Sequence, residues 1–172
     1  LLRKCKILAY KLGNEDFKTW VEYELNGYPK DKKFLPNYRI LKNVYSKGHF
    51  SGSFGSGIQN ADVPTFNLPK ELQENLTTAN FFSPIATLEN LTTTTASTLS
   101  QEWGATILAQ FGNNMYEGYV CMQAWKVIPT SFVIGIVDTI KTKILNFVLE
   151  IEMIDKNAGD VERWSHMFEQ LK

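Results

Sequence analysis

Glu24-Leu25-Asn26-Gly27-Tyr28 and Leu35-Pro36-Asn37-Tyr38-Arg39 are the two stretches on which the fold depends. Apolar residues recur at helical spacing before the first stretch, and Gly27 followed by Pro29 ends the helix. Glu24 lies in the middle of the apolar face, where a carboxylate needs a partner. We predict that Arg39 binds it bidentately and clamps the following loop to the helix, with a catalytic or ligand-binding role as the alternative.

The chain before this helix predicts a second one. Leucines, Cys5 and Ala9 fall on one face of residues 1–12, and basic residues fall on the other. Gly13 closes this helix, and Asn14 can cap the helix that runs to about Asn26. The two helices are expected to form an antiparallel αα-hairpin.

The middle of the chain predicts short strands and short helices. Apolar pairs alternate with glycines between Ile40 and Asn67, a pattern typical of twisted strands with bulges. Helices are predicted at 69–76 and after Pro84. We expect a further helix over 101–111, capped by Ser100.

The last third contains the strongest strand and the longest helix. Gly118–Ile128 is apolar on both faces, which predicts a central strand. Pro129 opens a helix through about Ile154 with one main apolar stripe, and Ile134, Leu145 and Leu149 form a second stripe that a partner subunit could cover. The predicted class is α+β: an N-terminal αα-hairpin, a small, mostly antiparallel sheet and a long C-terminal helix packed on it.

Composition excludes several classes of function. Eighteen basic and eighteen acidic residues give a net charge of zero, so no global field attracts nucleic acid or anionic lipid. Cys5 and Cys121 are too few for a disulfide framework, and we expect them to be buried free thiols of a cytoplasmic protein. Charged residues interrupt the apolar segment 132–154, so no membrane span is expected.

No constellation of residues predicts a metal or a cofactor. The tract Gly48–Gly57 lacks the spacing of a P-loop or a dinucleotide fingerprint, so its glycines are expected to pack closely against neighbouring strands. The histidines are His49, expected in a surface loop, and His166, expected to be solvated; neither has neighbours at zinc-site spacing. The enzymatic alternative uses Glu24, Tyr38, Arg39 and His49 beside the glycine tract.

As an ordered set, several motifs resemble the AbiTii domain of bacterial abortive-infection proteins over residues 1–155. The resemblance implies phage defence in the bacterial cytoplasm, with no established active site. Besides Glu24 and Arg39 of the clamp, the structural or interaction candidates are Tyr28, Tyr38, Gly52, Phe54, Trp125 and Asp138. The motifs are Leu1–Cys5, Trp20, Glu24–Tyr28, Leu35–Arg39, the Gly/Phe/Ser tract 48–55, Gly118–Cys121, Ala124-Trp125 and Asp138–Lys141.

These observations favour a non-enzymatic module that oligomerises or senses a partner. We expect residues 1–155 to form the AbiTii-like domain, and 156–172, with a hinge at 156–159, to begin a helical linker to a following domain. The expected partners are a second copy, an effector domain in the same polypeptide beyond residue 172 and a phage-derived trigger. A nuclease, nucleotide-processing or nucleotide-sensing domain that uses Arg39, His49 and the glycine tract is the alternative.

Overall fold

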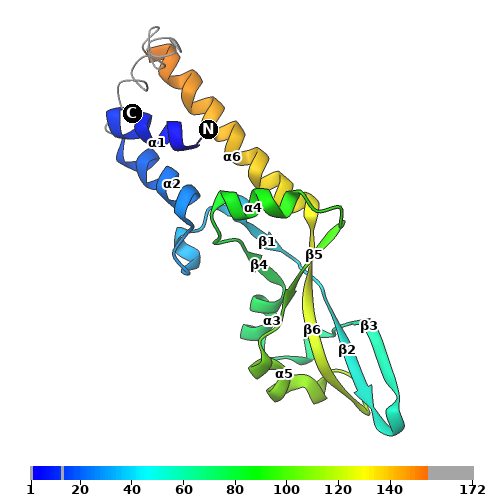
Figure 1. Cartoon of the computed structure of the whole chain (residues 1–172). Helices are drawn as coiled ribbons and strands as arrows, with labels where there is room; N and C mark the ends of the chain where they lie inside the picture. Colours follow the sequence, from blue (N-terminus) through cyan, green and yellow to red (C-terminus); the bar gives the residue numbers. More distant parts are fainter. Residues whose placement is uncertain (1, 13, 155–172) are drawn as a thin grey trace.

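The computed structural model describes residues 2–12 and 14–154, and within them the chain forms an elongated α+β fold (Figure 1). Helices α1, α2, α4 and α6 gather at one end, which we call the helical lobe. A four-stranded antiparallel sheet with α3 and α5 forms the other end, the sheet lobe. The predicted class, with its helix pair, antiparallel sheets and long last helix, is confirmed. The expected packing of the last helix on the sheet is wrong, because the buried residues of α6 pack with α1, α2 and α4 and not in the core of the four-stranded sheet.

The helical lobe is built as the sequence pattern indicates. It contains α1 (Leu2–Leu12), α2 (Glu15–Asn26), α4 (Ile85–Thr92) and α6 (Thr130–Ile154). The Asn14 side chain caps α2 by accepting a hydrogen bond from the Phe17 N–H at 2.9 Å, as predicted. Buried apolar residues of all four helices form one core, including Cys5, Val21, Leu88 and Ile136.

Two antiparallel sheets form the rest of the framework. The larger one has the order β3-β2-β6-β5, and the smaller one pairs β1 with β4. Helices α3 and α5 cover one face of the larger sheet through a core that includes Phe50, Leu76, Trp103 and Cys121. The elements are β1 (Ile40–Lys42), β2 (Ser46–Gly52), β3 (Gly57–Asp62), α3 (Lys70–Leu76), β4 (Thr78–Asn80), β5 (Thr98–Glu102), α5 (Ala105–Phe111) and β6 (Tyr119–Pro129).

Gly48 and Gly52 have the close-packing role that the sequence predicts for the glycine tract, whereas Gly55 has open space around it and a φ of +77°. A Cβ at Gly48 would come within 2.7 Å of the Gln123 carbonyl oxygen, and one at Gly52 within 2.5 Å of the Ser56 Oγ. The register between β2 and its neighbours shifts beside His49, as expected for a bulge. Gly48 and Gly52 are required because the neighbouring chain leaves no room for a side chain.

Two predictions for the sheet lobe are wrong. Residues 98–102 form strand β5 on the edge of β6, so Ser100 lies in a strand and caps no helix; the helix begins only at Ala105, after Gly104. His49 lies in strand β2 rather than in a loop. In both places, pairing with β6 overrides a local sequence preference.

Strand β6 is central, as predicted, since β2 and β5 both pair with it. Its two faces are not equally covered, however. Val120 is 42% exposed and Met122 is 64% exposed, because α3 and α5 pack against the other face only. The expectation of cover on both faces therefore fails for the first half of this strand.

Helix α6 follows β6 without an intervening loop, because Pro129 ends the strand and Thr130 begins the helix. Its main stripe is buried as predicted, with Ile136, Ile140 and Ile144 each at most 3% exposed. The second stripe, Ile134, Leu145 and Leu149, is exposed. Cys5 and Cys121 are buried free thiols, as expected.

The expected hinge at 156–159, the helix after it and His166 lie outside the described residues. Within the described ranges, no helix combines the length and the apolar character needed to cross a membrane.

Candidate functional site

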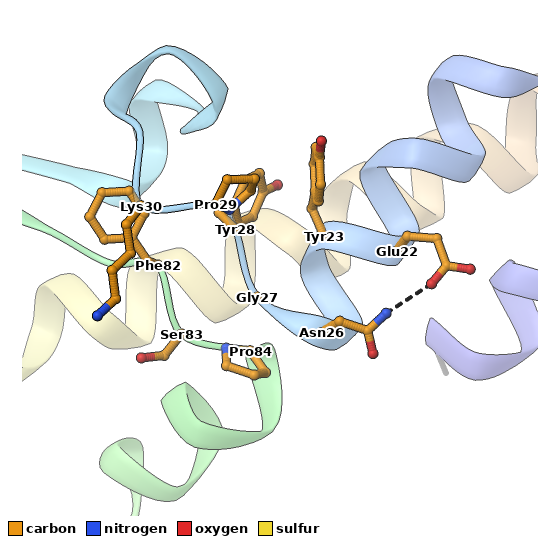
Figure 2. A pocket seen from close by; sticks show the side chains of 10 residues that line it. All are labelled: Glu22, Tyr23, Asn26, Gly27, Tyr28, Pro29, Lys30, Phe82, Ser83 and Pro84. Atoms are coloured by element: carbon orange, nitrogen blue, oxygen red, sulfur yellow. Dashed lines mark hydrogen bonds between the residues drawn. The ribbon is translucent and has the colours of Figure 1, made fainter.

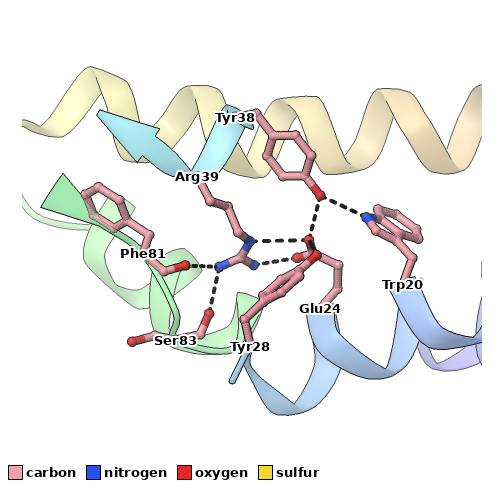
Figure 3. Close-up of polar contacts among 7 residues, drawn as sticks. All are labelled: Trp20, Glu24, Tyr28, Tyr38, Arg39, Phe81 and Ser83. Atoms are coloured by element: carbon pink, nitrogen blue, oxygen red, sulfur yellow. Dashed lines mark hydrogen bonds and ion pairs between the residues drawn. The ribbon is translucent and has the colours of Figure 1, made fainter. Parts of the chain in front are cut away.

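The centre of the candidate site is a fully buried ion pair between Glu24 on α2 and Arg39 at the end of the 3-10 turn 37–39 (Figure 3). Arg39 Nε donates to Glu24 Oε1 at 3.3 Å, and Arg39 Nη2 donates to Glu24 Oε2. Both side chains are 0% exposed. The predicted bidentate pairing is confirmed, and it joins the helix pair to the chain that enters β1.

The remaining guanidinium nitrogen binds a third segment. Arg39 Nη1 donates to the carbonyl oxygens of Phe81 and Ser83, both at 2.8 Å. These carbonyls lie between β4 and α4, as Figure 3 shows. One side chain therefore holds together α2, the start of β1 and the segment that leads into α4.

Two tyrosines and a tryptophan complete the cluster around the carboxylate. The Tyr28 and Tyr38 hydroxyls each donate to Glu24 Oε1 at 2.7 Å, and Trp20 Nε1 donates to the Tyr38 hydroxyl at 2.8 Å. The Arg39 guanidinium also lies 4.9 Å from the centroid of the Tyr28 ring. We call Trp20, Glu24, Tyr28, Tyr38 and Arg39 the buried cluster.

The environment of the buried cluster keeps both tyrosines protonated. Burial, with the Glu24 carboxylate as the next cause, raises the pKa of Tyr38 to about 12. The same causes raise the pKa of Tyr28 still further. A tyrosine in this state donates a hydrogen bond and is a poor general base at neutral pH.

These shifts predict a stability loss in alkali. Between the ordinary tyrosine pKa of 10.0 and about 12, the unfolded chain releases protons that folded Tyr38 retains, so the free energy of unfolding should fall as pH rises through this window. Urea titrations at a series of pH values measure the fall, and Tyr38→Phe should make it shallower. Tyr45→Phe, at a 53% exposed residue, is the control and should leave the slope unchanged. Equal slopes for both variants would contradict the prediction.

A shallow groove of about 550 Å³ lies beside the buried cluster (Figure 2). Tyr23, Gly27, Lys30, Phe82 and Pro84 are among its lining residues. Tyr28 lines it as well, but its hydroxyl is bonded to Glu24. Neither Glu24 nor Arg39 lines the groove. A molecule bound there would contact Tyr28 of the buried cluster but not its two charged side chains.

The residues of the enzymatic alternative are not brought together. Arg39 lies in the buried cluster, whereas His49 lies on the four-stranded sheet. His49 Nδ1 accepts a hydrogen bond from the Asn60 N–H at 3.1 Å, and its ring packs edge-on against Trp125 with the centroids 4.8 Å apart. The two side chains share no described contact. In the described part of the chain, His, Cys, Asp and Glu side chains form no group suited to a metal ion.

The other sequence-predicted residues lie in separate places. Gly52 and Phe54 are at the tip of the β2–β3 hairpin, where Phe54 has a positive φ of 55° and is fully exposed. Trp125 lies on β6, and Asp138 lies on the exposed side of α6. The contacts through Phe81 and Ser83 were not predicted, because a backbone carbonyl leaves no signal in the residue type.

The fold and the cluster define an α+β domain whose central polar side chains are enclosed and bonded to one another. The AbiTii family model matches residues 1–167, so the chain belongs to the AbiTii family, as its motifs indicate. This membership places it in abortive infection, a defence of bacteria against phage. No curated protein and no solved structure matches the chain.

Proposed function

We propose that this AbiTii domain is a non-enzymatic protein-interaction module of a cytoplasmic antiphage system. In this role it contacts a second copy or a phage-derived trigger and thereby controls an effector. The main support for the proposal is that the charged side chains of the buried cluster are enclosed by protein and have no access to solvent. Among the described residues, Glu24 and Arg39 form an ion pair in which both side chains are 0% exposed and hydrogen-bonded to protein groups.

An acid, a base or a nucleophile must reach its substrate, and the side chains of Glu24 and Arg39 are 0% exposed. The Tyr28 and Tyr38 hydroxyls both donate hydrogen bonds to Glu24, and three donors converge on its Oε1. Burial raises the pKa of the Cys121 thiol, which lowers its reactivity as a nucleophile. The cluster therefore supports a structural role, which is to hold the helical lobe in one shape.

The surface, by contrast, presents large apolar side chains. Phe54, Phe66 and Met122 are at least 64% exposed in the sheet lobe, and α6 has an exposed apolar stripe. An exposed apolar stripe along one side of a helix is typical of a surface that contacts another protein. Such surfaces support an interaction role for the domain.

A phage-protection assay with the full-length protein tests this proposal. His49→Gln removes the one described histidine and should leave protection unchanged, because a non-enzymatic domain does not need it. In parallel, the purified domain is incubated with RNA, DNA and nucleotides, and no turnover is expected. Turnover that His49→Gln abolishes, together with lost protection, would replace the proposal with the nuclease or nucleotide-processing alternative.

A further inference from the structure

The exposed side of α6 carries an ordered pattern that the other described elements leave uncovered. Ile134 is 49% exposed, Leu145 is 57% exposed and Leu149 is 48% exposed, although each lies on a helix whose other side is buried. With about 100° of rotation per residue, these three side chains fall within roughly 60° of arc. In Figure 1, α1 and α2 lie on one side of α6, and none of the described helices and strands lies on the opposite side.

Two charged residues lie in the same stripe, between the apolar ones. Asp138 and Lys141 are both exposed, and they follow Ile134 and precede Leu145 along the helix. Among the described residues neither side chain forms an ion pair within the chain. The stripe therefore reads apolar, acidic, basic, apolar over about 16 Å of helix.

This order is symmetric about the midpoint between Thr139 and Ile140. Ile134 lies as far before that point as Leu145 lies after it, and Asp138 lies as far before it as Lys141 lies after it. A twofold axis through the midpoint would place an antiparallel second helix with Ile134 against Leu145 and Asp138 against Lys141. In a twofold interface each contact occurs twice, so one pattern supplies both halves.

We propose that α6 pairs with α6 of a second copy of this chain, antiparallel and across this twofold axis. The charges select the direction, because a parallel pair in register would place Asp138 against Asp138 and Lys141 against Lys141. The charges also indicate that the partner is a second copy of this chain, because the stripe is complementary to itself when one helix is turned antiparallel to the other. The inference rests on the proposed function, since it names one partner of the interaction module.

Light scattering over a concentration series tests the pairing. The wild-type domain should approach twice the monomer mass as its concentration rises, and Leu145→Glu should remain monomeric because it buries a charge in the seam. Phe66→Glu, which changes a more exposed apolar residue in the sheet lobe, is the matched control and should still pair. Urea unfolding of each variant confirms that the fold is retained. A wild-type domain that is monomeric at every concentration overturns the proposal.

Charge reversal tests the register. Asp138→Lys and Lys141→Asp should each weaken self-association about tenfold or more, since each places like charges opposite one another twice. An equimolar mixture of the two variants should form a heterodimer, because all facing charges are then opposite. Single variants that pair as well as wild type, or a mixture that fails to pair, overturn this register. The turnover assay tests the proposed function, and the mass from light scattering tests the pairing of α6. The two measurements are independent, so either proposal can fail without the other.

Discussion

Arg39→Met should reduce the free energy of unfolding by about 3 to 5 kcal/mol, because it leaves the Glu24 carboxylate buried without its cation. It also leaves the carbonyls of Phe81 and Ser83 without their donor. Urea unfolding followed by tryptophan fluorescence measures the loss, with Trp20 as a reporter inside the cluster. A variant as stable as wild type would show that the clamp does not hold the lobe together.

A double variant separates the buried charge from the packing. Glu24→Gln with Arg39→Met removes both charges but keeps an amide oxygen that can accept from Tyr28 and Tyr38. It should be more stable than Arg39→Met alone, because no unpaired charge remains inside the protein. Lys33→Met is the surface control, since the ion pair of Lys33 with Asp31 is exposed, and no resolvable change is expected.

Gly27→Ala should cost about 2 to 4 kcal/mol of stability. Gly27 has φ +93° and ψ 158°, a conformation that is almost restricted to glycine, and an added Cβ would lie 2.9 Å from the Phe82 carbonyl oxygen. The same oxygen accepts the Tyr28 N–H, so it cannot retreat without loss of that bond. The substitution should therefore also separate α2 from the segment before α4.

Gly135→Ala is the matched control for this prediction. Gly135 lies inside α6 with open space around it, and alanine favours a helix by about 1 kcal/mol over glycine. The added carbon should thus destabilise the protein at residue 27 and stabilise it at residue 135. Thermal unfolding of both variants shows the signs, and a loss at both positions would contradict the reasoning.

Much of the helical lobe could be predicted because its signals are local. A carboxylate in an apolar stripe requires a partner, and Arg39 is the first arginine after Glu24 and can bind a carboxylate through two nitrogens. Asn14 and Gly27 mark the ends of α2 by their residue types. The family followed from the order of these motifs, and the match to the AbiTii model confirms it.

The rest depended on tertiary pairing. Residues 98–102 have no alternating pattern, and only the neighbouring edge of β6 makes them a strand. The sequence of β6 did not show that helices cover one face only, so the exposure of Met122 was missed. The contacts of Arg39 with Phe81 and Ser83 involve backbone atoms, for which no residue type is diagnostic.

The direct passage from β6 into α6 has a mechanical consequence. Strand residues 119–129 and helix residues 130–154 share one unbroken run of regular structure that crosses both lobes. No loop residue separates the two elements. We therefore expect that a contact that changed the twist of β6 near the hairpin tip would also change the direction of α6.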